Sequence, residues 1–402
     1  MNTHDVIILG GGLIGQATAI ALDLHGMRSV VIDPVDPSST LTTEFDGRVT
    51  AISSSSWKLF DAMGIGPNMV DDARPIRRIE VRDGAQGAPL DFETQGEDLP
   101  LGRMLENRVL RRELWASIQK ATHVTRKFGT RAVSVDRGDH GVTATLDDGS
   151  VHHAPLLLVC EGRHSSTRAE AGISVAAWDY ASMSIVTAMD HSQPHGDTAH
   201  QIFYPGGPVA LLPMNPGTRS ALVWSLPDDQ AKAYMKVGDR AFLAEVSRVT
   251  ANILGDLSFA APRALYPLHF RHTAKMTENR LALVGDAGHG IHPIAGQGFN
   301  LGLRDVAVMA EVLVDGARLG LDFGDAQLLA RYQRWRAGDV MAVTVACDSL
   351  VRLFGLPGKT ARAARRFGLG AVQSAKPLKD LFMAEARGES GNLPMMLQGE
   401  LV

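Results

Sequence analysis

The sequence has little of what marks secreted, membrane-spanning or nucleic-acid-binding proteins. Among its 402 residues are only two cysteines, Cys160 and Cys347, with neither metal-ligand spacing nor a disulfide framework. No apolar run is long enough to predict a membrane span, and no basic, apolar leader follows Met1. The net charge of −4 argues against a nucleic-acid-binding protein. We therefore expect a cytoplasmic protein from a reducing compartment.

The start of the chain does contain a pattern typical of a dinucleotide-binding unit. An apolar run over 5–9 and a helical pattern over 14–24 are followed by a second apolar run over 29–33. Between the first run and the helix lie three glycines with phosphate-binding spacing: Gly10, Gly12 and Gly15. They permit a tight turn, the approach of a pyrophosphate and close helix–strand packing. Asp33 is placed to accept hydrogen bonds from an adenosine ribose, but the pattern does not separate NAD from FAD.

A second glycine-rich loop follows the buried strand expected over 280–285. Asp286, at the end of that strand, can accept hydrogen bonds from a polyhydroxy chain such as ribityl. The glycines of 296–298 leave backbone N–H groups free at the start of a helix expected over 298–319. Such donors suit the pyrimidine edge of a flavin, which gains negative charge on reduction. The second loop therefore favours FAD.

The rest of the chain predicts an α/β fold with a second, antiparallel sheet. The run over 76–92 indicates a hairpin, and strand-like runs with turns fill 180–270. Because the two flavin loops must meet on one cofactor, the Rossmann-type FAD domain is expected to be discontinuous. The predicted division is a FAD domain of 1–72, 101–178 and 271–340, a substrate domain of 73–100 and 179–270, and a helical C-terminal segment of 341–402.

The second loop resembles the second flavin motif of class A flavoprotein monooxygenases. The residues that match are Gly285, Asp286, His289, Pro293, Gly296, Gln297, Gly298 and Asn300. Its ending, Asn-Leu-Gly-Leu-Arg-Asp305, is similar to the UbiH/UbiF/VisC family of FAD-dependent ubiquinone-biosynthesis hydroxylases. Over most of the chain, further segments resemble that family: the arginine segment at Arg48, the helix start at Asn107 and the strands of 203–213 and 223–225.

The resemblance implies an FAD-dependent monooxygenase. NAD(P)H or another donor reduces FAD, dioxygen adds at flavin carbon 4a to give a hydroperoxide, and a polyprenylated phenol is hydroxylated. Gly10, Gly12, Gly15, Asp33, Arg48, Asn107 and the second loop are then the cofactor-binding residues. Pro293 is expected to form a rigid wall over the flavin. His289 is a candidate acid–base residue. His289 and His292 do not predict a metal site, because no suitable third ligand lies nearby in the sequence.

One segment departs from the family pattern. Where the family has Asp-Gly followed by Ser and Arg, this chain has Glu161-Gly162, then Ser165 and Arg168. The glutamate keeps the charge and adds a methylene. Two interpretations stay open: Glu161 acts beside the flavin and the nicotinamide donor, or it caps the turn that follows its strand.

Two other functions compete with a ubiquinone-biosynthesis hydroxylase. A class A monooxygenase for a small soluble aromatic acid needs a cation for the substrate carboxylate, and Arg219 is the only arginine between Ala171 and Arg240. The apolar run over 201–212 favours a prenylated ring instead. The second competitor is a non-catalytic flavin-binding scaffold within a biosynthetic complex.

The tail contains a candidate contact for a membrane surface. An apolar cluster over 349–357 precedes four cations in 359–367, among them Arg362, Arg365 and Arg366. Basic residues beside apolar ones suit an anionic lipid interface. The alternative is that Leu350, Leu353 and Phe354 pack on the body of the protein and the arginines form a solvated face.

Overall fold

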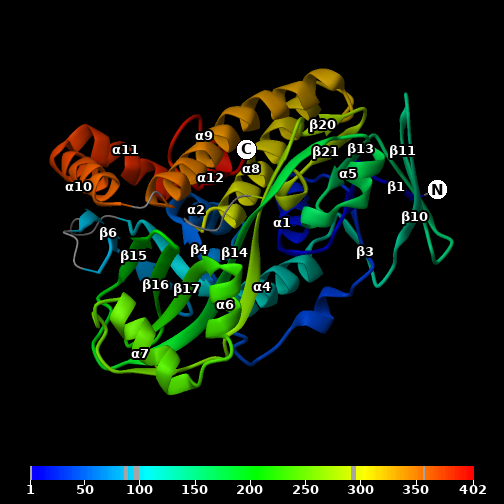
Figure 1. Ribbon diagram of the computed structural model, residues 1–402. Coiled ribbons are helices and arrows are strands. Elements are labelled where there is room, and N and C mark those ends of the chain that lie inside the picture. The colour runs from blue at the N-terminus through cyan, green and yellow to red at the C-terminus, as the bar shows by residue number, and fades with distance from the viewer. Residues whose placement is uncertain (1, 86–88, 95–98, 291–295, 356–357) are drawn as a thin grey trace.

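Two large β-sheets and a bundle of C-terminal helices make up the molecule (Figure 1). The structure is a computed structural model that describes residues 2–85, 89–94, 99–290, 296–355 and 358–402, without the side chains of 179–180, 343–352, 355, 359 and 361. The expected α/β class with an antiparallel sheet and a helical C-terminal segment is confirmed. In the described residues, no helix is long and apolar enough to cross a membrane.

A six-stranded sheet takes its strands from both halves of the sequence. In sheet order these are β20 (Thr277–Glu278), β21 (Leu281–Leu283), β13 (Leu156–Val159), β2 (Val6–Leu9), β3 (Ser29–Asp33) and β9 (Val124–Phe128). All neighbours are parallel except β20 and β21. The inner strands are buried on both faces, which explains why they occur as unbroken apolar runs. The sheet therefore places the ends of β2 and β21 on either side of the end of β13.

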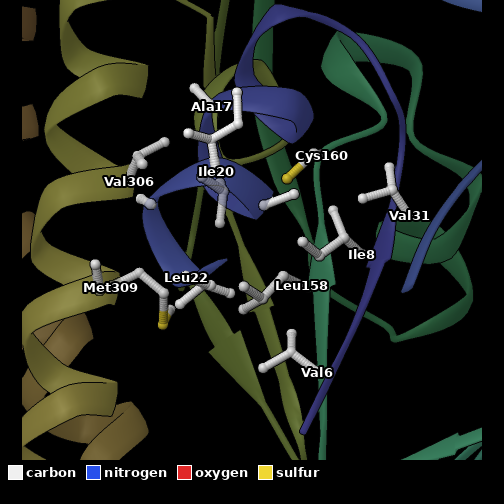
Figure 2. Packing of buried hydrophobic residues seen from close by; sticks show 14 of the residues in the cluster. Val6, Ile8, Ala17, Ile20, Leu22, Val31, Leu158, Cys160, Val306 and Met309 are labelled. Atoms are coloured by element: carbon white, nitrogen blue, oxygen red, sulfur yellow. The ribbon is translucent and has the colours of Figure 1, made fainter. Parts of the chain in front are cut away.

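Two helices pack on one another over this sheet (Figure 2). Helix α1 (Leu13–Asp23) follows β2, and helix α8 (Gly298–Arg318) lies against it. Gly302 makes the close approach possible, since a Cβ there would press into the Ile14 side chain. Cys160 lies in the same core as a free thiol, and burial raises its pKa to about 12, so it stays protonated.

Two small sheets flank the six-stranded one. The first contains β1 (Asn2–Thr3), β12 (Val151–Ala154), β11 (Gly141–Leu146) and β10 (Ala132–Gly138). The second contains β4 (Val49–Ser53), β8 (Gly102–Glu106) and β5 (Arg74–Ile76). The helical segments near them are η1 (Pro37–Thr40), α2 (Ser54–Ala62), α3 (Gly66–Met69), α4 (Asn107–Lys120), η2 (Gly162–His164) and α5 (Ser166–Glu170).

The second large sheet has nine strands and lies beside the first. Its order is β22 (His289–Gly290), β19 (Ala264–Thr273), β14 (Val175–His191), β17 (Arg219–Pro227), β16 (Gly207–Met214), β15 (Thr198–Tyr204), β6 (Arg78–Asp83) and β7 (Leu90–Glu93), with β18 (Leu257–Phe259) on β14. The predicted hairpin is confirmed as β6 and β7. The expectation of a wholly antiparallel sheet is wrong at one place, since β15 and β6 are parallel.

The prediction that 180–270 holds only strands and turns is also wrong. Helices α6 (Asp228–Tyr234) and α7 (Asp239–Val249) lie in this region. Phe242, Val246 and Val249 recur at helical spacing and pack with Trp224 on one face of the sheet. The need to cover that apolar face accounts for the two helices.

The C-terminal helices are α9 (Ala326–Gly355), α10 (Lys359–Ser374), α11 (Lys376–Arg387) and α12 (Met395–Gln398). The helical tail begins before the expected boundary at residue 341, which lies inside α9. The prediction that Arg365 is a surface cation is wrong. Its guanidinium is buried, pairs with Asp83 at 3.3 Å and lies over the Phe354 ring. Phe354 is buried too and stacks on Phe203, whereas Leu353 is exposed.

Candidate functional site

The first glycine loop joins β2 to α1 and is shaped by close backbone contacts. Gly10 has φ +102°, and a Cβ there would overlap the Cys160 carbonyl. A Cβ on Gly15 would overlap the Gly10 carbonyl oxygen. At Gly12, by contrast, no atom lies within 4 Å of such a Cβ, and no side chain caps the helix that begins there. The loop thus presents open space in front of a helix N-terminus, as a bound pyrophosphate requires.

Two side chains brace this loop. Asp33 at the end of β3 accepts hydrogen bonds from the backbone N–H groups of Gly11 at 2.5 Å and Val35 at 2.7 Å. Gln16 donates through Nε2 to the Gly11 carbonyl at 2.8 Å, while its buried Oε1 has no partner in the described structure. Asp33 therefore fixes the turn itself, in addition to the ribose contact predicted for it.

The second glycine loop begins where β21 ends and forms the short 3-10 helix η3 (Gly285–Ala287). Gly285 has φ +67°, and a Cβ added there would lie 3.2 Å from the Ile14 side chain of α1. The second loop therefore packs against the helix that follows the first loop. The Asp286 side chain is 42% exposed, and its carboxylate lies 4.0 Å from the Arg163 guanidinium. Its oxygens thus remain accessible to a ligand.

A buried ionic network holds the second loop in place. Asp305 of α8 accepts a hydrogen bond from the Gly285 N–H at 2.7 Å and lies 2.7 Å from His289 Nε2. Its other oxygen accepts from Arg336 Nε of α9 at 2.6 Å, and Arg336 also pairs with Asp339. Burial alone would raise the pKa of the Asp305 carboxyl, but His289 and Arg336 outweigh it and hold the pKa below its usual value. The carboxylate is therefore charged.

The start of α8 is tied to strand β4 by Asn300. Its Oδ1 accepts from the Ser53 N–H at 2.9 Å, and its Nδ2 donates to the carbonyls of Ala51 and Gly296. Gly296 has φ +62°, and Gln297 precedes the helix without a side-chain cap. Among the described residues, no atom lies within 4 Å of a Cβ placed on Gly298. A second uncapped helix N-terminus is thus present, and Asn300 fixes its position.

Arg48 and Asn107, which were predicted to bind the cofactor, lie together at the edge of the three-stranded sheet. The Arg48 carbonyl accepts from the Asn107 N–H at 3.0 Å, and Asn107 Oδ1 accepts from Thr50 at 2.6 Å. The guanidinium of Arg48 is partly exposed and pairs with Asp46. Both residues adjoin β4, the strand that Asn300 ties to α8.

The Glu161 segment connects both loops, and the structure shows Glu161 capping the turn after its strand. Its carboxylate accepts from the Ser165 hydroxyl at 2.5 Å and from the Thr167 hydroxyl at 3.0 Å. Arg168, which is buried, donates to the Ala287 carbonyl at 2.9 Å and so fastens this segment to η3. The capping interpretation thus has direct contacts, and contact of Glu161 with flavin or nicotinamide stays a prediction.

Two histidines and a proline were predicted near the flavin face. His289 is fully buried, and its Nδ1 has no hydrogen-bond partner in the described part of the chain. Its strand β22 pairs with β19, so the loop passes from the six-stranded to the nine-stranded sheet. Pro293 and His292 lie outside the described residues. In the part of the chain that the structure describes, no three His, Cys, Asp or Glu side chains are grouped so as to hold a metal ion.

Two residues that position the site had no role predicted from the sequence. Asp305 ended the second motif without an assigned role, and Arg336 acts on the second loop from α9. Arg168, which was named only as part of the Glu161 segment, acts on the same loop through the Ala287 carbonyl. Asp305 lies four positions after Leu301 and three before Val308, on an apolar helical face, and this spacing was a usable signal for an inward carboxylate. Arg336 gave none, because a cation in a helix is usually solvated.

These features fit FAD. The six-stranded sheet brings two glycine-rich loops to neighbouring strand ends, each leading into a helix whose first turn lacks a side-chain cap. Open space at Gly12 and Gly298 leaves room for a ligand to contact the protein backbone at the start of both helices. One helix suits a pyrophosphate and the other the pyrimidine edge of a flavin, with the accessible Asp286 between them.

Comparisons with known proteins agree with this geometry. The chain matches the FAD binding domain family over residues 3–346. It is 41% identical over 389 residues to the ubiquinone hydroxylase UbiL of Rhodospirillum rubrum, covering 96% of this chain and 89% of that protein. It is 33% identical to the 3-demethoxyubiquinol 3-hydroxylase of Escherichia coli, covering 96% of this chain and 98% of that protein.

Solved structures show the same fold at lower identity. The p-nitrophenol 4-monooxygenase PnpA of Pseudomonas putida superimposes with a TM-score of 0.78 at 18% identity, covering 98% of this chain and 100% of that one. A variant of HpxO from Klebsiella pneumoniae, complexed with FAD, gives 0.73 at 20% identity, covering 96% and 99%. The fold, the two loops and the family match together establish that this chain is an FAD-dependent monooxygenase and belongs to the UbiH/UbiF/VisC family of ubiquinone-biosynthesis hydroxylases.

Proposed function

We propose that this enzyme hydroxylates the aromatic ring of a polyprenylated phenol in ubiquinone biosynthesis, with dioxygen and NAD(P)H or another donor as co-substrates. The relatives named as ubiquinone hydroxylases, which span nearly the whole chain, support this substrate class. When bound, FAD supplies the activation of dioxygen. The protein's part is to hold the ring near the flavin and to exclude water.

The two glycine loops would hold opposite ends of one FAD. In this assignment, Gly12 and the start of α1 contact the pyrophosphate and Asp33 the adenosine ribose. Asp286 accepts from the ribityl chain, and the helix start at 297–298 faces the pyrimidine edge. The buried His289 is bonded to Asp305, so we assign it the role of positioning the second loop, with acid–base catalysis as the alternative.

The observation that favours a prenylated ring over a small aromatic acid is the state of Arg219. Its guanidinium forms two hydrogen bonds to the Asp190 carboxylate, at 2.7 and 3.0 Å. The charge needed for a substrate carboxylate is therefore already neutralised. The neighbouring face of the sheet is apolar, with Ala188, Ala221 and Met214 packed beside Val49 of β4. Such a wall suits an uncharged, apolar ring substituent.

The experiment is to measure aerobic oxidation of NADH and NADPH by the FAD-loaded enzyme with different phenols. We expect a short-chain prenylated phenol to accelerate the oxidation and to yield a product with one added oxygen. 4-Hydroxybenzoate, which carries a carboxylate, should give neither effect. Equal hydroxylation of both compounds would contradict the assigned substrate class. No hydroxylated product with NADH, with NADPH, or with enzyme whose FAD is first reduced chemically and then exposed to dioxygen would contradict the function.

We also propose that the enzyme meets this substrate at a membrane surface, within reach of the other enzymes of the pathway. A polyprenyl phenol partitions into the bilayer, so a protein whose described helices do not cross a membrane must approach it from the outside. The candidate surface for this approach lies on helices α10 and α11.

A further inference from the structure

Helices α10 and α11 form a C-terminal arm, residues 359–387, that lies along the edge of the nine-stranded sheet (Figure 1). The arm is attached by its inner side. Leu369, Val372 and Met383 pack against the apolar cluster of Leu90 and Phe92 on β7. The buried pair of Arg365 with Asp83 of β6 adds a charged anchor. The arm's orientation on the sheet is therefore fixed.

The outer side of the arm is apolar and uncovered. Phe367 is 80% exposed, Leu381 is 60% exposed, and Leu378 is exposed too. Phe382 belongs partly to the inner side, because its ring lies 6.2 Å from that of Phe92. Large apolar side chains on one exposed helix pair are unusual for a surface that meets only water. The outer group, Phe367, Leu378 and Leu381, is called the apolar ridge below.

The arm also differs in charge from the rest of the chain. Residues 359–387 contain seven Lys and Arg against two Asp and Glu, while the whole chain has a net charge of −4. Of these cations, Arg362 and Lys376 are exposed. Arg365 and Lys379 are turned toward carboxylates of the body, Asp83 and Asp91, and the half-exposed Arg366 also lies 4.0 Å from Asp83. Positive charge is thus concentrated where the apolar side chains are uncovered.

We propose that the apolar ridge and its flanking cations dock the enzyme onto an anionic lipid bilayer. The combination of exposed apolar side chains with cations matches the chemistry of the lipid interface, where headgroups are anionic and acyl chains lie just beneath. A binding site for a protein would be expected to combine a groove with polar groups that can form hydrogen bonds to the partner. These side chains instead lie on the outer surface of two helices. The inference rests on the proposed function for its purpose, because it brings a bilayer-dissolved phenol to the enzyme.

The arm is also connected to the sheet that would receive the substrate. Phe354, at the end of α9, stacks on Phe203 of β15 with ring centroids 3.9 Å apart. Arg365 lies over the same Phe354 ring from α10. A bilayer at the ridge would therefore lie beside the edge of the nine-stranded sheet.

Flotation of the full-length, FAD-loaded enzyme with vesicles tests the proposal. We expect the protein to float with phosphatidylcholine vesicles that contain phosphatidylglycerol, and to remain below with phosphatidylcholine alone. Phe367→Asp with Leu381→Asp, and separately Arg362→Glu with Lys376→Glu, should each reduce the floated fraction about tenfold or more. Matched controls are Leu319→Asp with Val133→Asp, both exposed elsewhere, and Arg131→Glu with Arg240→Glu; these should float like the wild type.

Turnover separates this proposal from the proposed function. All four double variants should hydroxylate a soluble short-chain phenol at the wild-type rate, and the two ridge variants should lose turnover of a long-chain phenol held in vesicles. Wild-type protein that does not float, ridge variants that float normally, or flotation that needs another protein would overturn the docking face. Such results with intact turnover of the soluble phenol would leave the proposed function standing.

Discussion

The two glycine-rich loops hold their shape by different means. The loop of Gly10 to Gly15 is fixed by backbone contacts so close that no Cβ fits at either end. The loop that starts at Gly285 is fixed by a buried carboxylate, Asp305, which bonds its backbone, the His289 ring and the guanidinium of Arg336. The first loop depends on the absence of side chains, and the second depends on charges from two helices.

The difference between the two loops has a functional explanation. The first loop can be rigid, since a pyrophosphate makes the same contacts in every state of the cofactor. In the proposed arrangement, the second loop faces the part of the flavin that changes charge during reduction. A buried network of Asp305, His289 and Arg336 is a means of holding backbone donors at that place in a low-dielectric surrounding. Substitutions in the two loops should therefore fail in different ways.

The largest effect is expected for Asp305→Asn, which leaves the buried Arg336 with Asp339 as its remaining charge partner. The variant should lose about 3–5 kcal/mol of stability. The control is Asp315→Asn on the same helix, whose pairs with Arg331 and Arg318 are partly exposed and worth at most about 1 kcal/mol. Chemical denaturation measures both. Equal stability losses for the two variants would contradict the role of the network.

The stability of the wild-type protein should depend on pH through the same carboxylate. Since His289 and Arg336 lower the pKa of Asp305, its charge stabilises the fold fully above the unfolded aspartate pKa of about 4. This contribution is lost as the pH falls through the lower pKa of the folded state. The Asp305→Asn variant should therefore lose less stability than the wild type on acidification.

The first loop is tested by Gly15→Ala compared with Gly12→Ala. At Gly15 the new methyl group would overlap the Gly10 carbonyl, so α1 must move, at a cost of about 1–3 kcal/mol. At Gly12 it meets open space, so the FAD-free protein should melt like the wild type, while FAD affinity falls. Melting curves and FAD titration give both quantities. A Gly15→Ala variant with normal melting and normal FAD content would refute the account of this loop.

A smaller effect is expected for Asp286→Ala, since its carboxylate is accessible and holds no other element in place. Losing hydrogen bonds to the ribityl chain should weaken FAD binding by about 1–3 kcal/mol. Fluorescence titration of the apoprotein measures this, with Asp136→Ala, an exposed carboxylate of β10, as the control. A variant that purifies fully loaded with FAD would show the assignment to be wrong.

The smallest effect is expected for Asp33→Ala. It should weaken FAD affinity by about 1 kcal/mol through the adenosine ribose and the loosened Gly11 turn. Hydroxylation by the enzyme that remains loaded should be unchanged, because the adenosine end is remote from the chemistry. Normal FAD affinity together with lost hydroxylation would contradict the assignment of Asp33 to the adenosine end of the cofactor.

Much of the cofactor-binding core could be predicted from the sequence because its signals are local. Strands buried on both faces occur as unbroken apolar runs, and the glycines follow them directly. Helices α6 and α7 were missed although Phe242, Val246 and Val249 recur at helical spacing, since turns and strands dominate their surroundings. Their division from the FAD domain at the predicted boundaries stays a prediction.

What could not be predicted depends on partners distant in the sequence. Arg365 looks like one of several solvated cations, and its carboxylate Asp83 lies 282 positions away. Arg336 reaches Asp305 across 31 positions, and Asn300 reaches Ser53 across 247. Only the fold decides which of the chain's charges are buried, so the inner side of the arm determines which cations can face a membrane.

The most direct test of the central claim is the origin of the oxygen atom in the product. The FAD-loaded enzyme should be supplied with reductant and a prenylated phenol under isotopically heavy dioxygen, and the product analysed by mass spectrometry. We predict a ring hydroxyl that carries one labelled oxygen atom, formed in proportion to the reductant consumed. Unlabelled product, or reductant consumed entirely to hydrogen peroxide whether or not phenol is present, would contradict the account.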